Sequence, residues 1–191
     1  MKLAGKIVLV TGVDPFVGRG AARFLGSQGA TVYLMERRRA NGGQPYYGML
    51  HRLAETITAA GGVGIAVPYD HADDHRVRAL FERIESEQGH LDILVNNATI
   101  NITASDVSFR PPFWERNLGQ ADEITLGLRL AYLSSYYAAL LLLWSEKALV
   151  ANLSSYEYND AAYAATKAGL DRMTWHMAQH FKVYGFKGTG I

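Results

Sequence analysis

Residues 6–20 read KIVLVTGVDPFVGRG, and this stretch decides the fold class. Its first part, Lys6–Thr11, is a continuous run of β-branched and apolar residues, which is typical of a strand buried on both faces of a parallel sheet. A turn with three glycines follows, and after it a helical pattern that stops near Gly26 and Gly29. A strand, a glycine turn and a helix in this order predict the first half of a β-α-β unit.

Outward from this unit, short apolar runs alternate with amphipathic helical patterns along the chain. The further predicted strands are Thr31–Met35, Val63–Val67, Leu91–Val95 and Ala148–Leu153, and the predicted helices cover 50–60, 77–84, 118–144 and 161–184. This alternation predicts an α/β fold with a doubly wound parallel sheet and right-handed crossovers, in a single domain over residues 1–191.

Two polar segments, Arg37–Tyr47 and Asn97–Phe113, follow the second and fourth predicted strands. Ligands bind at the carboxyl ends of the strands in such sheets, so both segments are candidates for a binding site. Each can also be an ordinary surface loop.

The composition limits the classes of function. The chain has 191 residues, of which 49% are hydrophobic and 19% charged, the profile of one soluble globular domain. Its 19 Lys and Arg against 18 Asp and Glu give a formal net charge of +1 without a concentrated basic stretch, so nucleic acid is not an expected partner. The absence of cysteine excludes disulfides, Cys-ligated metal sites and thiol nucleophiles.

Neither a metal site nor a membrane partner is expected. His176 and His180 have the spacing of metal ligands on a helix, but no third ligand lies nearby in the sequence. The apolar stretch Leu130–Trp144 contains two serines and is shorter than the roughly 20 residues of a membrane span, so a buried or interface helix is expected. The first residues lack a targeting signal, and the expected location is the cytoplasm.

Three motifs stand where the predicted strands end or a helix begins. Thr11-Gly12 and Gly18 follow the first strand, Asn96-Asn97-Ala98 follows the fourth, and Tyr163-Ala-Ala-Thr-Lys167 opens the last helix. In this order and spacing they resemble the TGxxxGxG, NNAG and YxxxK patterns of the short-chain dehydrogenases/reductases. The resemblance covers the whole chain. It implies a Rossmann-like fold, a homodimer or homotetramer through the long helices, and an NAD(P)-dependent oxidoreductase that interconverts a secondary alcohol and a ketone or aldehyde.

The resemblance also implies which residues bind the dinucleotide, with backbone amides of the glycine turn facing the pyrophosphate. The implied set is Thr11, Gly12, Phe16, Val17, Gly18, Glu36, Arg37, Asp70, Asn96, Asn97, Ala98, Tyr163 and Lys167. Phe16 replaces the middle glycine of the pattern, which would distort the turn or weaken binding. At the end of the second strand, Glu36 favours NAD, whereas Arg37 and the two arginines behind it favour the 2′-phosphate of NADP. Three guanidiniums against one carboxylate favour NADP.

Tyr163 and Lys167 carry the expected acid/base chemistry. They are four residues apart at the start of a helix, so both side chains lie on one face. A free phenol has a pKa near ~10, and a nearby ammonium lowers it, so that Tyr163 can exchange the alcohol proton during hydride transfer. The resemblance places the substrate-orienting serine at Ser155 or Ser154, where a hydroxyl would hydrogen-bond the carbonyl oxygen.

Several positions depart from the family pattern. Ser155 lies closer to Tyr163 than is usual, and Gly127 stands in the helical segment where many members have an asparagine. A sixth strand is expected to begin at Phe186–Ile191, and the family's final strand and substrate loop are absent from this sequence, so a fold truncated after the start of strand six is expected. These departures leave an alternative, a non-catalytic member that binds a dinucleotide or forms an oligomer.

Overall fold

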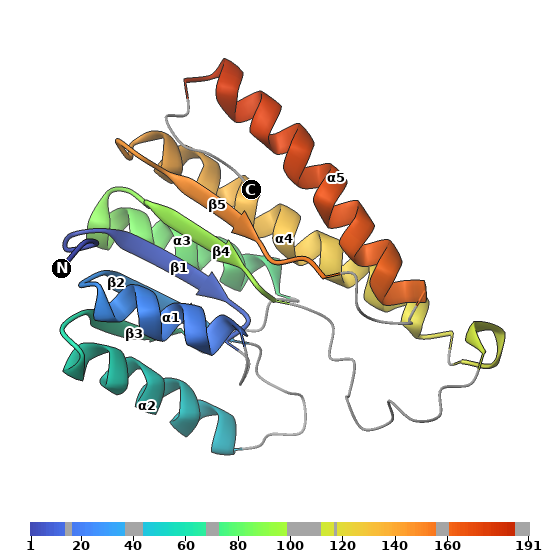
Figure 1. The fold of residues 1–191 in the computed structure, drawn as a ribbon, viewed down its shortest axis with the longest axis horizontal. Coiled ribbons are helices and arrows are strands. Elements are labelled where there is room, and N and C mark those ends of the chain that lie inside the picture. Colours follow the sequence, from blue (N-terminus) through green and yellow to red (C-terminus); the bar gives the residue numbers. More distant parts are fainter. Residues whose placement is uncertain are drawn as a thin grey trace.

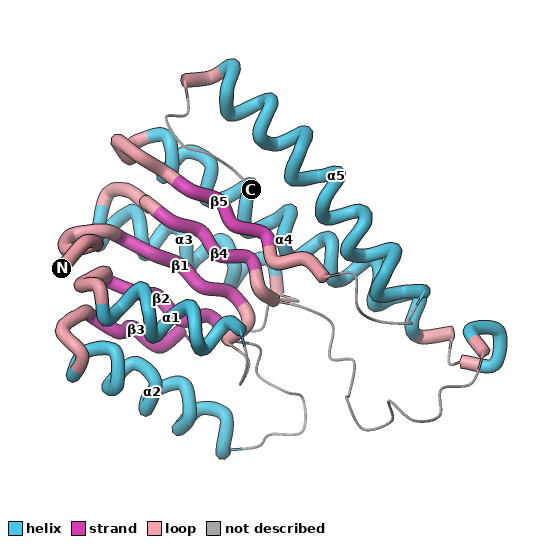
Figure 2. Tube along the Cα trace, in the orientation of Figure 1, coloured by secondary structure: helices cyan, strands magenta, loops and turns pink. Residues whose placement is uncertain are grey.

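The computed structural model describes residues 1–13, 17–36, 44–67, 73–98, 112–116, 118–155 and 161–185. Within these ranges strands and helices alternate along the chain (Figures 1 and 2). The strands are β1 Ile7–Thr11, β2 Thr31–Met35, β3 Val63–Val67, β4 Ile93–Asn96 and β5 Leu149–Asn152. The helices are α1 Val17–Ser27, α2 Gln44–Ala59, α3 Asp74–Gln88, α4 Gln120–Leu143 and α5 Ala161–Val183, with a short 3-10 helix at Phe113–Glu115.

The five strands form one parallel sheet in the order β3-β2-β1-β4-β5. Helices α1 and α2 cover one face, α3 and α4 lie behind the other, and α5 packs alongside α4 (Figure 1). The predicted doubly wound α/β fold is therefore confirmed. The strand order reverses between β1 and β4, and ligands of such sheets bind beyond the strand ends at this switch point.

The first strand lies at the centre of the sheet and is buried on both faces, as its sequence predicts. Ile7 and Leu9 point into the core formed with α3 and α4, whereas Val8 and Val10 point into the core formed with α1 and α2. Burying one such side chain stabilises the fold by roughly 1.5 to 3 kcal/mol. The alternation of side chains along one short strand thus joins two helical layers.

The edge of the sheet opposite the carboxyl strand ends is held by Asp92, which is 1% exposed. Its carboxylate accepts hydrogen bonds from Lys6 Nζ at 2.8 Å, from the Ile7 amide at 2.8 Å and from Ser145 Oγ at 2.6 Å. Burial raises the pKa of Asp92, but the bonds from Lys6, Ser145 and Ile7 outweigh burial and hold the pKa below its usual value. This cluster joins the starts of β1 and β4 to the segment before β5.

Two sequence-based boundaries are corrected. Helix α2 begins at Gln44, inside the segment Arg37–Tyr47 that was expected to be a loop. The helix predicted at 118–144 is found as α4, but its apolar stretch is longer than the predicted Leu130–Trp144: Ile124–Leu143 is long and apolar enough to cross a membrane by length and composition, with 44% of the most apolar window buried in the protein. Since the inner face of α4 packs on the sheet, the expectation that the helix is partly buried holds. The expected start of a sixth strand at 186–191 lies outside the described residues.

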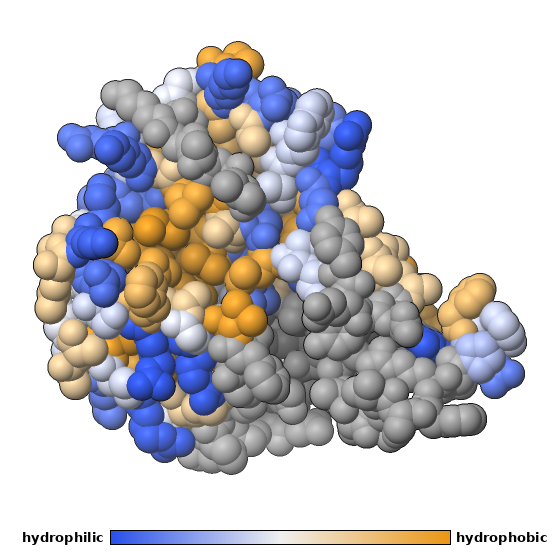
Figure 3. All heavy atoms as spheres, viewed as in Figure 1, coloured by the Kyte–Doolittle hydropathy of each residue, from blue (hydrophilic) through white to orange (hydrophobic). Residues whose placement is uncertain are grey.

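An apolar patch is visible on the face of the sheet that carries α1 (Figure 3). Over β4 and β5, no described helix lies on this face, and Ile93, Leu149, Ala151 and Leu153 are only partly buried. The sheet is therefore less covered here than around β1.

Candidate active site

The turn after β1 packs tightly against the segment that follows β4. Gly12 has a φ of +69°, a backbone conformation that residues with a side chain rarely adopt. A Cβ at Gly12 would overlap the backbone of Ala98 and come within 2.9 Å of the Asn97 carbonyl carbon. A Cβ at Gly18 would overlap the Gly12 carbonyl oxygen. Both glycines of the predicted motif are therefore required by close backbone packing.

Hydrogen bonds fix this junction. The Asn97 side-chain amide donates to the Gly12 carbonyl, and the Ala98 amide donates to Thr11 Oγ1 at 3.3 Å. The Gly12 amide donates to the Met35 carbonyl at the end of β2, at 2.8 Å. The first two predicted motifs, far apart in the sequence, thus meet at the carboxyl ends of β1, β2 and β4.

Helix α1 begins at Val17, four residues beyond the end of the described turn at Val13. The Val17 side chain is exposed to solvent. The first amides of a helix have no partner within the helix and attract anions. Three other predicted binding residues, Phe16, Arg37 and Asp70, lie outside the described residues.

A small, shallow hollow lies between the start of α1, the end of β2 and α2. It is lined by Val13, Arg19, Glu36, Met49, Leu50 and Leu53. Glu36 is partly buried and lies where the sequence places it, directly after β2. Arg19 was not among the predicted residues. Its position directly after Gly18, at the start of the helix that follows the glycine turn, could have identified it as a residue near the site.

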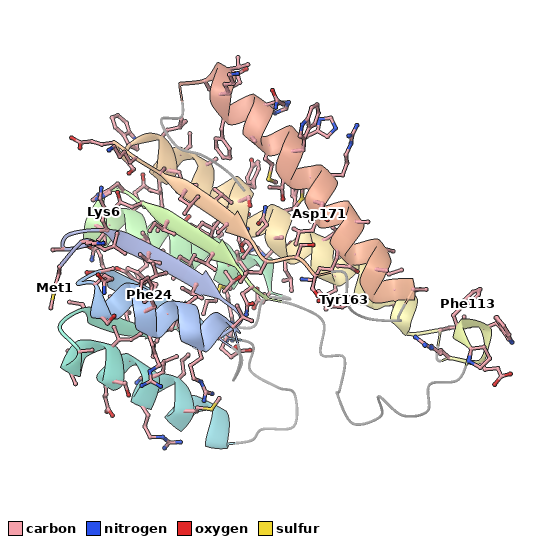
Figure 4. The ribbon with its side chains drawn as sticks, in the orientation of Figure 1. Met1, Lys6, Phe24, Phe113, Tyr163 and Asp171 are labelled. Atoms are coloured by element: carbon pink, nitrogen blue, oxygen red, sulfur yellow. The ribbon has the colours of Figure 1, made fainter. Side chains whose placement is uncertain are left out.

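Tyr163 and Lys167 lie side by side in the first two turns of α5. They are 8% and 6% exposed, and Lys167 Nζ lies 5.3 Å from the centre of the Tyr163 ring. Lys167 Nζ donates to the Leu153 carbonyl just after β5, at 2.7 Å. Burial lowers the pKa of the Lys167 ammonium, and the charge of Asp171 acts in the opposite direction. Figure 4 shows Tyr163 at the carboxyl end of the sheet and Lys6 at the other end.

The two predicted serines follow directly after Leu153, the residue that Lys167 holds. Ser154 is exposed and Ser155 is partly buried. Residues 156–160, which join Ser155 to the helix of Tyr163, are not described. The structure therefore brings both serines to the strand end next to Lys167.

A chain of buried amides ties the strand ends to α5. Asn96 Nδ2 donates to Asn152 Oδ1 at 2.8 Å and to Ser135 Oγ at 3.1 Å, and Asn152 Nδ2 donates to Thr174 Oγ1 at 2.7 Å. Within the described part of the chain, the buried Asn96 Oδ1 accepts no hydrogen bond. The Asn96 side chain, predicted to lie beside a bound ribose, is turned into the interior, where it links β4 to β5 and α4, and Asn152 extends the link to α5.

The histidine pair considered as metal ligands, and the aromatic residues that follow the polar segment after β4, lie apart from this group. Over the described ranges, no cluster of three or more metal-ligating side chains is present, and His176 and His180 are both exposed on α5. Phe113 and Trp114 are exposed and pack edge to face at 5.4 Å. Figure 4 shows Phe113 far from Tyr163.

The arrangement fits an extended ligand with anionic and ribose groups. At one end lies a hollow with one cation and one carboxylate, in the middle a glycine turn at a helix start, and at the other end a phenol with an ammonium. Such a row of groups along the switch point is the arrangement that binds a dinucleotide across the sheet.

Several known proteins are similar to this chain in sequence and in fold. The family model described as short chain dehydrogenase matches residues 6–190. The chain is 33% identical over 190 residues to the dehydrogenase/reductase SDR family member 1 of Mus musculus, covering 96% of this chain and 58% of the relative. It is 28% identical over 193 residues to the ketoacyl reductase HetN of Nostoc sp., covering 99% of this chain and 61% of the relative.

Among solved structures, a metagenomic short-chain oxidoreductase in complex with NADP matches with a TM-score of 0.81 at 25% identity. The match covers 100% of this chain and 80% of that protein. Of the two curated relatives named above, by contrast, the chain spans only about three fifths of the length.

Proposed function

The chain belongs to the short-chain dehydrogenase family, and from this premise we propose that it is an NAD(P)-dependent oxidoreductase that interconverts a secondary alcohol and a ketone or aldehyde. The observation that carries the proposal is the buried pair of Tyr163 and Lys167, held beside the strand ends that also hold the glycine turn. A chance pair of tyrosine and lysine on a solvent-facing helix surface would be exposed, whereas this pair is buried at the carboxyl edge of the sheet.

The residues present suit the binding of the dinucleotide along the strand ends. We assign the pyrophosphate to the turn of Gly12 and the start of α1 at Val17, and the adenosine ribose to the neighbourhood of Glu36 and Arg37. Asp70 is assigned to the adenine, and the backbone of Asn96–Ala98 to its ribose, by resemblance, because the Asn96 side chain faces the interior. The cofactor, when bound, supplies or accepts the hydride.

The chain's own residues handle the proton. In the reducing direction the Tyr163 hydroxyl donates its proton to the carbonyl oxygen, and a hydroxyl of Ser155 or Ser154 donates a hydrogen bond to the same oxygen. The Lys167 ammonium stabilises the phenolate that results. An ammonium has three donors, and Leu153 takes one of them, so Lys167 can also hold a ribose hydroxyl.

Thermal unfolding with NADPH and NADH in parallel tests dinucleotide binding. A ligand at 100 times its Kd stabilises a protein by about 2.7 kcal/mol, which for a domain of this size raises the Tm by roughly 5 to 10 °C. We expect this rise with NADPH and a smaller one with NADH. A parent protein whose Tm neither cofactor raises would contradict the proposal and favour a non-catalytic, oligomerising member.

Two glycine variants serve as a matched pair for the same measurement. Gly18→Ala places a methyl group against the Gly12 carbonyl and should lower the cofactor-induced rise in Tm. Gly20→Ala, two residues away, meets nothing within 4 Å and should keep the full rise. Far-ultraviolet circular dichroism confirms that both variants are folded.

We also propose that the chain forms a homodimer or homotetramer through its long helices. Tyr132, Tyr136 and Leu140 of α4 and Trp144, which caps its end, follow one another at four-residue intervals, and each is 52–79% exposed. This spacing puts them in one stripe, and a contiguous exposed apolar stripe marks an interaction surface.

Sedimentation of a charged variant tests this assembly. Leu140→Glu should convert the parent oligomer into monomers, because burying an unpaired carboxylate opposes association. The control is Phe24→Glu, which adds the same charge at an exposed aromatic residue of α1 and should leave the oligomer intact. A monomeric parent protein would disprove the proposal.

A further inference from the structure

We propose that Asn152 and Thr174 are positioning residues for the proton transfer, because the hydrogen bond between their side chains sets where Tyr163 and Lys167 lie at the end of the sheet. The inference rests on the proposed oxidoreductase function and adds two residues that act without meeting the reacting atoms. They act through the placement of α5, the helix that carries the phenol and the ammonium.

Among the described residues, two side-chain hydrogen bonds join α5 to the end of β5. Lys167 Nζ donates to the Leu153 carbonyl at 2.7 Å, and Asn152 Nδ2 donates to Thr174 Oγ1 at 2.7 Å. Lys167 and Thr174 are seven residues apart, so they lie on one face of the helix and about 10 Å apart along its axis. Their partners are consecutive residues of the chain. Helix α5 therefore cannot slide along the strand or turn about its axis without straining one of the two bonds.

The direction of the bond between Asn152 and Thr174 follows from its neighbours. The Thr174 hydroxyl donates its one hydrogen to the Leu170 carbonyl at 2.7 Å, so it can only accept from Asn152. The Asn152 amide must then turn Nδ2 towards α5 and Oδ1 towards β4, where Asn96 Nδ2 donates to it at 2.8 Å. This position needs one donor and one acceptor on the same short side chain, which neither a carboxylate nor an apolar residue supplies.

The other end of this chain of bonds lies in β4, which also holds the glycine turn. Asn96 binds Leu153 through its backbone carbonyl, at 3.0 Å, and Asn152 through its side chain. The next residue, Asn97, donates its side-chain amide to the Gly12 carbonyl. The proposed cofactor turn and the helix with the acid/base pair are thus both held to the end of one strand.

Proton transfer is sensitive to this placement. Tyr163 lies eleven residues, or about three turns, before Thr174, so both are on the face of α5 that carries Lys167. Helix α5 begins beyond the carboxyl end of β5 and runs back along it, so a shift of the helix moves the phenol along the strand ends (Figure 1). An error of about 1 Å in the position of a reacting group can cost of order 100-fold in rate.

Thr174→Val tests the inference, because it removes the hydroxyl and keeps the shape of the side chain. In carbonyl reduction by the full chain, we expect kcat to fall by roughly 10- to 100-fold. The KM for the carbonyl and the Kd of NADPH should change little, because Thr174 lies about three turns from Tyr163 and outside the groups assigned to either ligand. Thr174→Ser keeps the hydroxyl and should restore most of the parent kcat.

Thr56→Val is the matched control. Thr56 Oγ1 donates to the carbonyl four residues earlier in α2 at 2.7 Å, the same local bond that Thr174 makes within α5. Thr56 is exposed, and this bond joins two residues of one helix. Thr56→Val should therefore keep the parent kcat.

A double variant tests whether the two residues act through each other. Asn152→Ala removes the other partner of the bond and should lower kcat at least as much as Thr174→Val. If both act through one bond, adding Thr174→Val to Asn152→Ala should lower kcat no further. Independent effects would instead multiply.

Two further readouts separate positioning from a general loss of structure. Hydrogen–deuterium exchange, which needs no turnover, should show faster uptake in the first turns of α5 in Thr174→Val but not in Thr56→Val. In alcohol oxidation, the pH of half-maximal rate should rise in Thr174→Val, because a displaced ammonium stabilises the phenolate less. Asp171, whose charge also acts on Lys167, is carried by the same helix and moves with it.

The outcomes distinguish this inference from the proposed function. If the parent protein reduces no carbonyl of the panel, the proposed function is wrong and the inference with it. If the parent is active and Thr174→Val keeps its kcat and its pH profile, the inference alone is overturned. Failure of Thr174→Ser to restore kcat, or an equal fall in Thr56→Val, overturns it as well.

Discussion

Replacement of Tyr163 by phenylalanine is expected to lower the rate of carbonyl reduction by about 10²- to 10⁴-fold, the contribution of a positioned general acid. The substitution removes the phenol hydroxyl of Tyr163 and leaves the ring that packs beside the buried Lys167 ammonium. The measurement is the oxidation of reduced cofactor by the purified protein, over a panel of ketones and aldehydes.

The fold and the cofactor site should survive this substitution. Most of the cofactor-induced rise in Tm should remain in Tyr163→Phe, because only one of the implied cofactor contacts, the phenol, is lost, whereas the ring and the glycine turn stay. Tyr184→Phe removes an exposed phenol just beyond the other end of α5 and should keep the parent rate. A Tyr163→Phe variant that reduces carbonyls at the parent rate would refute the assigned proton transfer.

The second large effect is on stability and arises at the opposite edge of the sheet. Asp92→Asn leaves three donors facing a neutral amide that can accept with only one oxygen. We expect a loss of roughly 2 to 3 kcal/mol, below the value for a fully buried ion pair because Lys6 is 35% exposed. For a domain of this length, the Tm in a thermal unfolding experiment should fall by roughly 5 to 10 °C.

The loss should depend on pH with a defined sign. The folded state holds the pKa of Asp92 below its usual value, so the unfolded chain binds the proton more readily. The stabilisation is complete well above the unfolded pKa near ~3.9 and is lost as the pH falls through it towards the folded pKa. The Tm difference between the parent and Asp92→Asn should therefore shrink below about pH 4. His90 also faces this carboxylate, with Nε2 at 3.2 Å.

An exposed ion pair provides the matched control. Glu82 accepts a hydrogen bond from Arg78 at 2.7 Å, as short as the bonds to Asp92, but both side chains are in solvent. Glu82→Gln should therefore change the Tm little at any pH. An equal fall in Tm in both variants would mean that burial does not account for the contribution of the Asp92 hydrogen bonds to stability.

Much of the fold could be predicted from the sequence, because buried strands are continuous apolar runs and amphipathic helices repeat apolar residues every three or four positions. Thr31–Met35 and Val63–Val67 were predicted to the residue. The start of α2 was missed because Gln44–Tyr47 contains Pro and follows a polar, glycine-containing run, which favours a loop locally, whereas the structure continues the helix into it. Proline is in fact well tolerated in the first turn of a helix, where the missing amide would have no helical partner, so Pro45 is compatible with a helix start.

The sequence predicts the candidate site well where close backbone packing requires a glycine. It predicts the site less well where the orientation of a side chain depends on hydrogen-bond partners that are distant in sequence. Gly12 and Gly18 could be identified because only glycine fits their contacts. The inward turn of Asn96 could not, since it depends on Asn152 and Ser135, which are distant in sequence. Arg19 was missed because a motif pattern treats the residue after its last glycine as variable.

The central position of β1 has a consequence for how the protein is made. The Lys6 and Ile7 contacts of Asp92 join residues 86 and 85 positions apart, so the most buried strand leaves the ribosome long before its neighbour β4 exists. At about 5 to 20 residues per second, β1 waits roughly 4 to 17 s for that partner. During this time it can pair only with β2, and its other edge presents apolar side chains and unpaired backbone groups to the cell. Slow translation or heat should therefore make the nascent chain depend on chaperones that bind extended apolar segments.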